Sequence, residues 1–170
     1  VDLVANLLKR NLVERSGRFK GPQESERIRR KEGVLEFLVE EKQNTAAGQD
    51  IVFTQSDLRA VQLAKTAIQT GWEILMGELD LKPPDLEAVY LAGAFGNFLD
   101  SRSAKEIGLV PKVDVRKIFF VGNTAVSGAK MALISLQERK EMVALASQAK
   151  YLELGAHPRF NEVFASSLSF

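Results

Sequence analysis

The sequence predicts an α/β fold in which a mainly parallel central sheet is flanked by helices, with a small antiparallel strand pair beside it. Two apolar segments, 88–92 and 117–121, each run into a glycine turn, and a helix begins soon after each turn. The resulting order of strand, helix, strand, helix favours parallel pairing with right-handed crossovers. Glycine turns at such strand ends are where α/β folds hold phosphates and nucleotides, so a nucleotide site is expected there.

The composition limits the size and surroundings of the protein. With 170 residues, of which 45% are hydrophobic and 26% charged, the chain can bury one substantial core but not two large domains. A net charge of +1 argues against binding to nucleic acid or to an acidic membrane surface. No apolar run approaches the roughly 20 residues that span a bilayer, and no signal peptide is recognisable, so a cytoplasmic location is expected. The first residue is Val1 rather than Met, which favours a fragment of a longer chain.

Metal and thiol chemistry have little support in this chain. The absence of cysteine excludes disulfides, thiolate zinc sites, cysteine nucleophiles and iron–sulfur ligation from these residues. His157 is the single histidine and cannot form a histidine cluster, so no metal site is predicted. For His157 itself, a local hydrogen bond at the start of a helix is favoured over a role as catalytic base.

The first third of the chain predicts one helix and two strands. Apolar residues at helical spacing indicate a short amphipathic helix over 2–11, with Asp2 suited to capping its start. Residues 15–33 are polar and basic and predict an exposed loop, whose basic run 27–31 is typical of a solvated loop or could dock an acidic partner. The segments 34–40 and 51–54 predict the antiparallel pair. Residues 12–54 would thus form a smaller peripheral lobe within a single domain that spans 1–170.

The most distinct helix is predicted to begin at Thr54. Thr54 and Asp57 resemble a capping box, and Pro83 with Pro84 stops the helix. Gly71 near its midpoint suggests close packing with a neighbour. The predicted core-facing stripe has spacings of three and four and consists of Leu58, Val61, Ala64, Ile68, Trp72, Leu75 and Leu79.

The remaining helices follow from caps and breakers. A short helix over 100–108 is capped by Asp100 and closed by Gly108. Two further helices are predicted over 124–136 and 137–149. The tail is predicted to add an edge strand over 151–154 and then a helix that includes Pro158 near its start and extends to Phe170.

The glycine turns themselves carry the functional argument. In Leu91–Gly96 small residues let the backbone turn sharply and approach a ligand, while Asn97 could bond a ribose or base and Phe95 could stack or simply pack. The loop at 121–129 repeats this pattern, and two such loops at neighbouring strand ends would form a crevice. The alternative is that the small residues serve only tight turns. Neither loop matches the Gly-x-Gly-x-x-Gly dinucleotide fingerprint, and no P-loop sequence is present.

These motifs resemble the carboxy-terminal half of the acetate and sugar kinase, heat-shock-protein and actin superfamily (ASKHA). More closely, the chain resembles the carboxy-terminal domain of reductive activators of corrinoid-dependent methyltransferase systems, which are ferredoxin-containing proteins that couple ATP hydrolysis to one-electron reduction of an inactive cobalamin. The resemblance covers nearly the whole chain. Its most specific segments are 50–68, 89–97, 121–133 and 153–160.

The resemblance implies a ribonuclease-H-like, actin-like ATPase half-domain. It implies ATP or ADP with Mg²⁺ in the full-length protein, and a [2Fe-2S] cluster on an amino-terminal domain that is absent from this chain. It also implies a corrinoid protein or corrinoid-dependent methyltransferase as partner, and a homodimer is a further expectation. No catalytic residue is identified, since the first phosphate loop would lie largely in the preceding half. The residues expected to bind nucleotide are Gly93, Ala94, Phe95, Gly96 and Asn97, with Gly122 and Asn123 from the second loop and Gln62 and Lys65 from the helix of the lobe that closes over the base.

Two other functions compete with this interpretation. One is a small-molecule kinase or an acyl-CoA dehydratase activator of the same superfamily. The other is a dimerisation or partner-binding module without nucleotide, whose glycine turns serve only packing. For Lys65, the alternative to a nucleotide contact is a solvated lysine on a helix surface.

Overall fold

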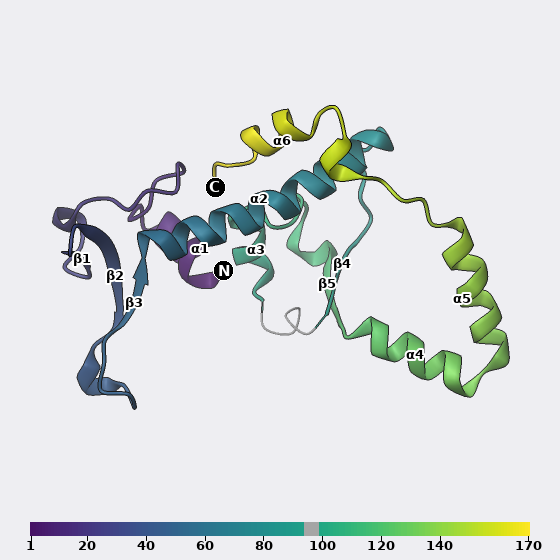
Figure 1. Ribbon diagram of the computed structural model, residues 1–170, viewed down its shortest axis with the longest axis horizontal. Coiled ribbons are helices and arrows are strands. Elements are labelled where there is room, and N and C mark those ends of the chain that lie inside the picture. The colour runs from purple at the N-terminus through teal and green to yellow at the C-terminus, as the bar shows by residue number, and fades with distance from the viewer. Residues whose placement is uncertain (94–98) are drawn as a thin grey trace.

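A long helix, α2 (Gln55–Glu78), runs through the middle of the molecule in the computed structural model, which describes residues 1–93 and 99–170. An antiparallel sheet lies beyond the amino end of α2, and a parallel pair of strands lies beneath its carboxyl half (Figure 1). Helix α6 (Phe160–Ser166) packs along α2. The predicted α/β class is confirmed.

The amino-terminal helix α1 (Asp2–Lys9) is confirmed, although Val1 rather than Asp2 occupies the cap position and Asp2 lies in the first turn. Its apolar face enters the main core, so this core joins α1, the 12–54 region, the start of α2 and the end of the short helix α3 (Ser101–Glu106). Residues 12–54 therefore share one hydrophobic core with α1 and α2. That these residues form a smaller peripheral lobe stays a prediction. The buried members of this core are Val4, Ala5, Leu7, Val13, Phe19, Leu58 and Ile107.

The antiparallel sheet has three strands rather than the predicted two. They are β1 (Ile28–Lys31), β2 (Val34–Glu40) and β3 (Ile51–Thr54), in the spatial order β1-β2-β3. Strand β1 lies inside the segment predicted to be an exposed loop, so that prediction was wrong there. A tight turn at Gly33, with a φ of +84°, returns the chain, and Ile28 opposite Phe37 is buried. The buried Ile28 side chain and this turn thus contribute to pairing a mostly charged segment.

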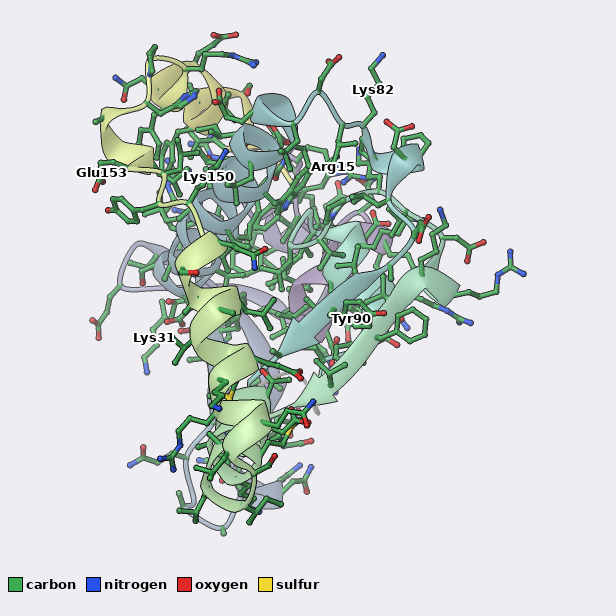
Figure 2. All side chains as sticks on the ribbon, turned by 90° about the vertical axis from the view of Figure 1, so that its right-hand side faces the viewer. Arg15, Lys31, Lys82, Tyr90, Lys150 and Glu153 are labelled. Atoms are coloured by element: carbon green, nitrogen blue, oxygen red, sulfur yellow. The ribbon has the colours of Figure 1, made fainter. Side chains whose placement is uncertain are left out.

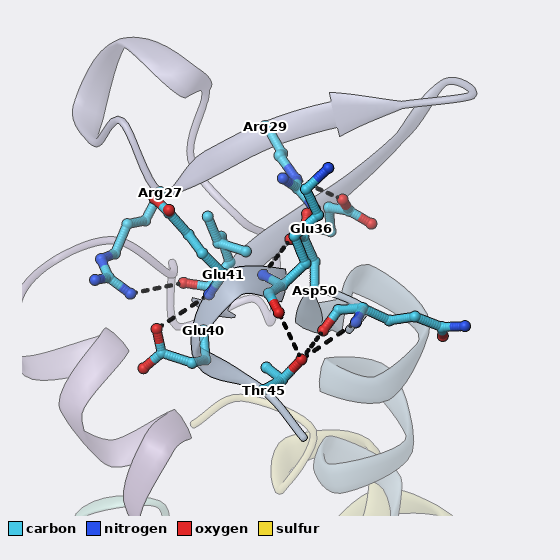
Figure 3. A network of polar contacts seen from close by, with 10 residues as sticks. Arg27, Arg29, Glu36, Glu40, Glu41, Thr45 and Asp50 are labelled. Carbon is cyan, nitrogen blue, oxygen red and sulfur yellow. Dashed lines mark hydrogen bonds and ion pairs between the residues drawn. The ribbon is translucent and has the colours of Figure 1, made fainter. Parts of the chain in front are cut away.

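Two arginines of the basic run tie the sheet together (Figure 3). Arg27 donates from Nη1 to the carbonyl oxygens of Leu38 and Val39 at 3.1 and 2.9 Å. Arg29 donates to Glu36 and to Asp50, each at 2.7 Å, and so joins β1, β2 and the residue before β3. The hydrogen bond from Arg29 also holds the pKa of the Asp50 carboxyl below its ordinary value. The run is thus structural at these two positions rather than a solvated loop.

The capping box at the start of α2 is confirmed. The Asp57 amide donates to Thr54 Oγ1 at 3.2 Å, and the Thr54 amide donates to Asp57 Oδ2 at 2.8 Å. Gly71 is buried against Leu154, but a Cβ there would lie 3.5 Å from Leu154 Cδ1, an ordinary van der Waals distance, so the packing does not require glycine.

The predicted apolar stripe of α2 describes its buried face only at the start of the helix, where Leu58 is fully buried. Ile68, Leu75 and Leu79 are 52%, 50% and 69% exposed, and Ala64 is exposed as well. Half of the buried residues are polar, and Gln62, Lys65 and Thr66 donate to backbone carbonyl groups of other segments. The buried residues of α2 are Leu58, Gln62, Lys65, Thr66, Thr70, Gly71, Ile74 and Met76.

The parallel pair consists of β4 (Val89–Ala92) and β5 (Ile118–Gly122). Helix α3 lies between them in sequence and is capped as predicted by Asp100, which accepts the Ser103 amide at 2.8 Å. A second small core of Ala104, Val110, Val113 and Ile118 supports these strands. The Tyr90 ring stacks on the Phe119 ring, with 5.6 Å between the ring centroids. Tyr90 lies on an open side of the sheet (Figure 2).

The carboxy-terminal third holds the two predicted helices, now α4 (Thr124–Ile134) and α5 (Leu136–Gln148), which pack on each other and extend away from the rest (Figure 1). The predicted edge strand over 151–154 is wrong: no described strand pairs with this segment, and a short 3-10 turn follows at Leu154–Ala156. Helix α6 begins after Pro158 and ends before Phe170, so it is shorter than predicted. Across the described residues, no helix is long and apolar enough to cross a membrane.

Replacing Thr54 by Ala should lower the free energy of unfolding by about 1 kcal/mol, because both hydrogen bonds of the capping box involve this residue and its side chain supplies one acceptor. Urea unfolding followed by circular dichroism measures the loss. Thr124→Ala is the matched control, since Thr124 is exposed at the start of α4 and its side chain forms no hydrogen bond among the described residues. Equal losses in both variants would contradict a structural role for the box.

Candidate functional site

The two glycine turns lie next to each other at the carboxyl edge of the parallel strands. Strands β4 and β5 run in the same direction with Tyr90 opposite Phe119 and Ala92 opposite Gly122. Beyond the last pair, the Gly93 amide donates to the Gly122 carbonyl oxygen at 2.7 Å. The predicted adjacency of the two turns is confirmed by this hydrogen bond.

Both glycines have a backbone conformation that other residues rarely adopt. Gly93 has a φ of +104° and Gly122 a φ of +65°. A Cβ built on Gly93 would meet no atom within 4 Å in the part of the chain that the structure describes. The turn therefore favours glycine at position 93. The described residues leave space beside the backbone there.

Asn123 connects the second turn to helix α4. Its Oδ1 accepts the Val126 amide at 3.2 Å, and its carbonyl oxygen accepts the Ser127 amide at 3.1 Å. Asn123 is thus the N-cap of α4, and its side-chain oxygen is already in use. The first amides of α4, at Thr124 and Ala125, have no partner within the helix and lie beside Gly122, where the helix dipole favours an anion.

The other four residues of the first turn lie outside the described residues. They are Ala94, Phe95, Gly96 and Asn97, and their contact with adenosine stays a prediction. The chain re-enters the described structure before Asp100. The hydrogen bond that Asp100 accepts from the Ser103 backbone lowers the pKa of its carboxyl.

The structure does not bring Gln62 and Lys65 together with these turns. Both are 1% exposed on the buried face of α2. The Gln62 amide nitrogen donates to the carbonyl oxygens of Ser16 and Leu168 at 3.0 and 2.7 Å, and its oxygen accepts from Arg59 at 2.6 Å. All the polar groups of this side chain are engaged, and a nucleotide contact at Gln62 stays a prediction that these bonds do not favour.

Lys65 anchors the carboxy-terminal segment. Its ammonium donates to the carbonyl oxygens of Ser167, at 2.5 Å, and of Ser169, and to Gln69 Oε1 at 3.0 Å. The Lys65 ammonium nitrogen also lies over the Phe170 ring, 5.6 Å from the ring centroid. Burial lowers the pKa of Lys65 to about 8. The alternative of a solvated surface lysine was wrong, and the nucleotide contact stays a prediction.

His157 fits the local role expected from the sequence. Its Nδ1 accepts the Arg159 amide at 3.2 Å near the start of α6, and its Nε2 lies 3.2 Å from a carboxylate oxygen of Glu78. These contacts hold the turn that precedes α6 against the end of α2.

Comparison with known proteins places the chain in a family. All of residues 1–170 match the family described as the carboxy-terminal domain of RACo, the ASKHA domain. The chain belongs to this family. It is 36% identical over 177 aligned positions to the corrinoid activation enzyme RamQ of Eubacterium limosum, with 100% of this chain and 30% of that protein covered. It is 27% identical over 125 positions to the [Co(II) methylated amine-specific corrinoid protein] reductase of Methanosarcina barkeri, covering 72% of this chain and 23% of that protein.

A solved structure agrees with this assignment. The reductive activator for corrinoid, iron–sulfur protein superimposes with a TM-score of 0.89 and 34% sequence identity over 99% of this chain and 27% of that protein. The ASKHA domain thus has the predicted ASKHA-type α/β fold. It spans less than a third of the length of the relatives it matches.

The stability of this ASKHA domain should rise with pH around the titration of Lys65. Because its pKa is about 8 in the folded state against 10.5 as the ordinary value, the unfolded chain binds more protons between these values, and stability increases from about pH 8 to about pH 10.5. Lys65→Met should lack this increase in thermal unfolding measured across that range. Lys31→Met, at an exposed position of β1, should keep it. If the stability of Lys65→Met rose with pH as much as that of the wild type, the lowered pKa of Lys65 would not be the cause of the rise.

Proposed function

We propose that this ASKHA domain is the adenosine-nucleotide-binding portion of an ATP-dependent reductive activator, which re-reduces an inactive corrinoid cofactor on a partner methyltransferase or corrinoid protein. The observation that supports it most is the hydrogen bond from Gly93 to Gly122, which joins two positive-φ glycine turns at one edge of the parallel strands. The relatives that resemble the chain over its whole length act, by their names, in corrinoid activation.

The residues at this edge fit a nucleotide. The space that the described residues leave beside Gly93 would let a flat adenosine or a phosphate approach the backbone, and the first amides of α4 offer hydrogen-bond donors for an anion. Bound ATP would supply the free energy of hydrolysis that a reduction against an unfavourable potential needs. This chain would hold the nucleotide. Nucleotide binding would also change the packing of α4 and β5, because it would favour the conformation with the higher nucleotide affinity.

An iron–sulfur cluster does not fit these residues. The chain contains no cysteine, and clusters are held by cysteine thiolates. In the proposed full-length activator the [2Fe-2S] cluster would therefore sit on another domain. The contribution of this chain would be conformational, and the electron would not pass through its side chains.

Replacing Gly93 by Val should abolish the binding of ATP and ADP while the fold is kept. A β-branched side chain fills the space beside the turn and disfavours its positive φ. Calorimetric titration with ATP and Mg²⁺ measures the loss, and circular dichroism with thermal unfolding tests the fold.

Gly33→Val is the matched control for this variant. Gly33 has a similar φ of +84°, and a Cβ there also meets no described atom within 4 Å, but it lies in the β1–β2 turn. It should carry a similar strain and bind nucleotide like the wild type. If the wild type binds neither ATP nor ADP, the glycine turns serve packing and the nucleotide proposal is wrong.

A further inference from the structure

A pocket of about 440 Å³ lies between the carboxyl half of α2, the start of α6 and the segments that lead into β4 and β5. It is distinct from the glycine edge, because residues 81–83 and 108–112 precede these parallel strands, whereas Gly93 follows β4 and Gly122 ends β5. Much of its wall is apolar and comes from Trp72, Met76, Leu81, Val110 and Val163.

Trp72 lines the pocket with its ring, and its indole nitrogen is buried without a partner in the described structure. The Trp72 indole nitrogen is shielded from solvent and finds no acceptor among the described residues. A buried N–H that lost its hydrogen bond to water costs free energy unless an acceptor replaces the water. Because this nitrogen has almost no accessible surface, a molecule in the pocket would pack on the Trp72 ring and would not accept from its N–H.

The charged side chains at the pocket are mostly cationic. Lys112 comes from the segment before β5, Arg159 from the start of α6, and Lys82 from the segment before β4. Within the described structure none of the three forms an ion pair. The one carboxylate in the lining, Glu73, accepts a hydrogen bond from the Gln69 side chain at 2.7 Å.

The geometry points to a binding site for a small organic anion in this pocket. A carboxylate or phosphate group would accept from Arg159 and Lys112, since charge-assisted hydrogen bonds to arginine are among the strongest that a protein makes. An aromatic or aliphatic group on the same molecule would pack on Met76 and Val110. A few convergent polar groups over an apolar wall are the usual composition of a small-molecule pocket.

Phenyl phosphate is the probe for this site, with phenol and inorganic phosphate as its two halves. Trp72 is the one tryptophan among the 170 residues, so its fluorescence reports directly on the pocket. At constant ionic strength, phenyl phosphate should change this fluorescence saturably and bind one to one in calorimetry, at least about tenfold more tightly than either half. The absence of a saturable change up to about 10 mM would overturn the proposal.

Two variants test the cationic residues. Lys112→Gln together with Arg159→Gln should weaken phenyl phosphate binding at least about tenfold, and both positions are exposed, so the fold should be kept. Lys31→Gln, an exposed lysine of β1 outside the pocket, is the matched control and should bind like the wild type. Equal binding by the double variant and the control would overturn the proposal.

Competition separates this site from the proposed nucleotide site. Phenyl phosphate should bind Gly93→Val as it binds the wild type, and ATP should not displace it. This result would support the pocket even if the protein bound no nucleotide. Displacement by ATP in Gly93→Val would show that the pocket itself takes nucleotide and would overturn the assignment of two separate sites.

Discussion

The position of helix α2 depends on polar side chains that bind backbone carbonyl groups of other segments. Gln62 reaches the carbonyl oxygens of Ser16 and Leu168, and Lys65 reaches those of Ser167 and Ser169. These two side chains join the loop after α1 and the carboxy-terminal segment to one face of α2. An isolated buried ammonium would be costly, and three oxygen acceptors and the Phe170 ring offset only part of its desolvation, since the pKa of Lys65 is still lowered to about 8. These hydrogen bonds hold the segment after α6 against α2. They thereby position α6, whose Val163 and the preceding Arg159 form one wall of the pocket beside Trp72.

The glycine edge depends on a different constraint, which is backbone geometry. Parallel pairing of β4 and β5 brings the ends of both strands to one place, and Gly93 and Gly122 at these ends have positive φ values that glycine adopts readily. Asn123 ends the turn by capping α4, so strand, turn and helix follow one another without a spacer. Within residues 1–93 and 99–170, the edge is therefore built largely from main-chain atoms of Gly93, Gly122 and the start of α4.

The sequence was sufficient to predict the features that depend on local chemistry. The capping box at Thr54, the cap at Asp100 and the adjacency of the two glycine turns all follow from short motifs and strand order. The buried face of α2 could not be predicted in this way, because its partners are carbonyl groups more than a hundred residues away in sequence. Hydrophobic periodicity assumes apolar neighbours and so selected Ile68 and Leu75, which are half exposed. The polar residues 62, 65, 66 and 70 share one helix face, and this spacing was the signal that was missed. Strand β1 was missed because its charged residues match a loop in composition, although Arg27 and Arg29 are used for pairing.

The bend between α4 and α5 sets how the protein must be handled in solution. Leu133, Ile134 and Leu136 are 77%, 84% and 74% exposed there, and none of the residues of either helix is buried within the described structure. Water in contact with so many branched side chains makes contact between molecules favourable, and sulfate or phosphate buffers strengthen that tendency. Sedimentation across a range of protein concentrations and buffer anions is therefore a necessary companion to every titration, because clustering at this bend would change the apparent stoichiometry without any ligand.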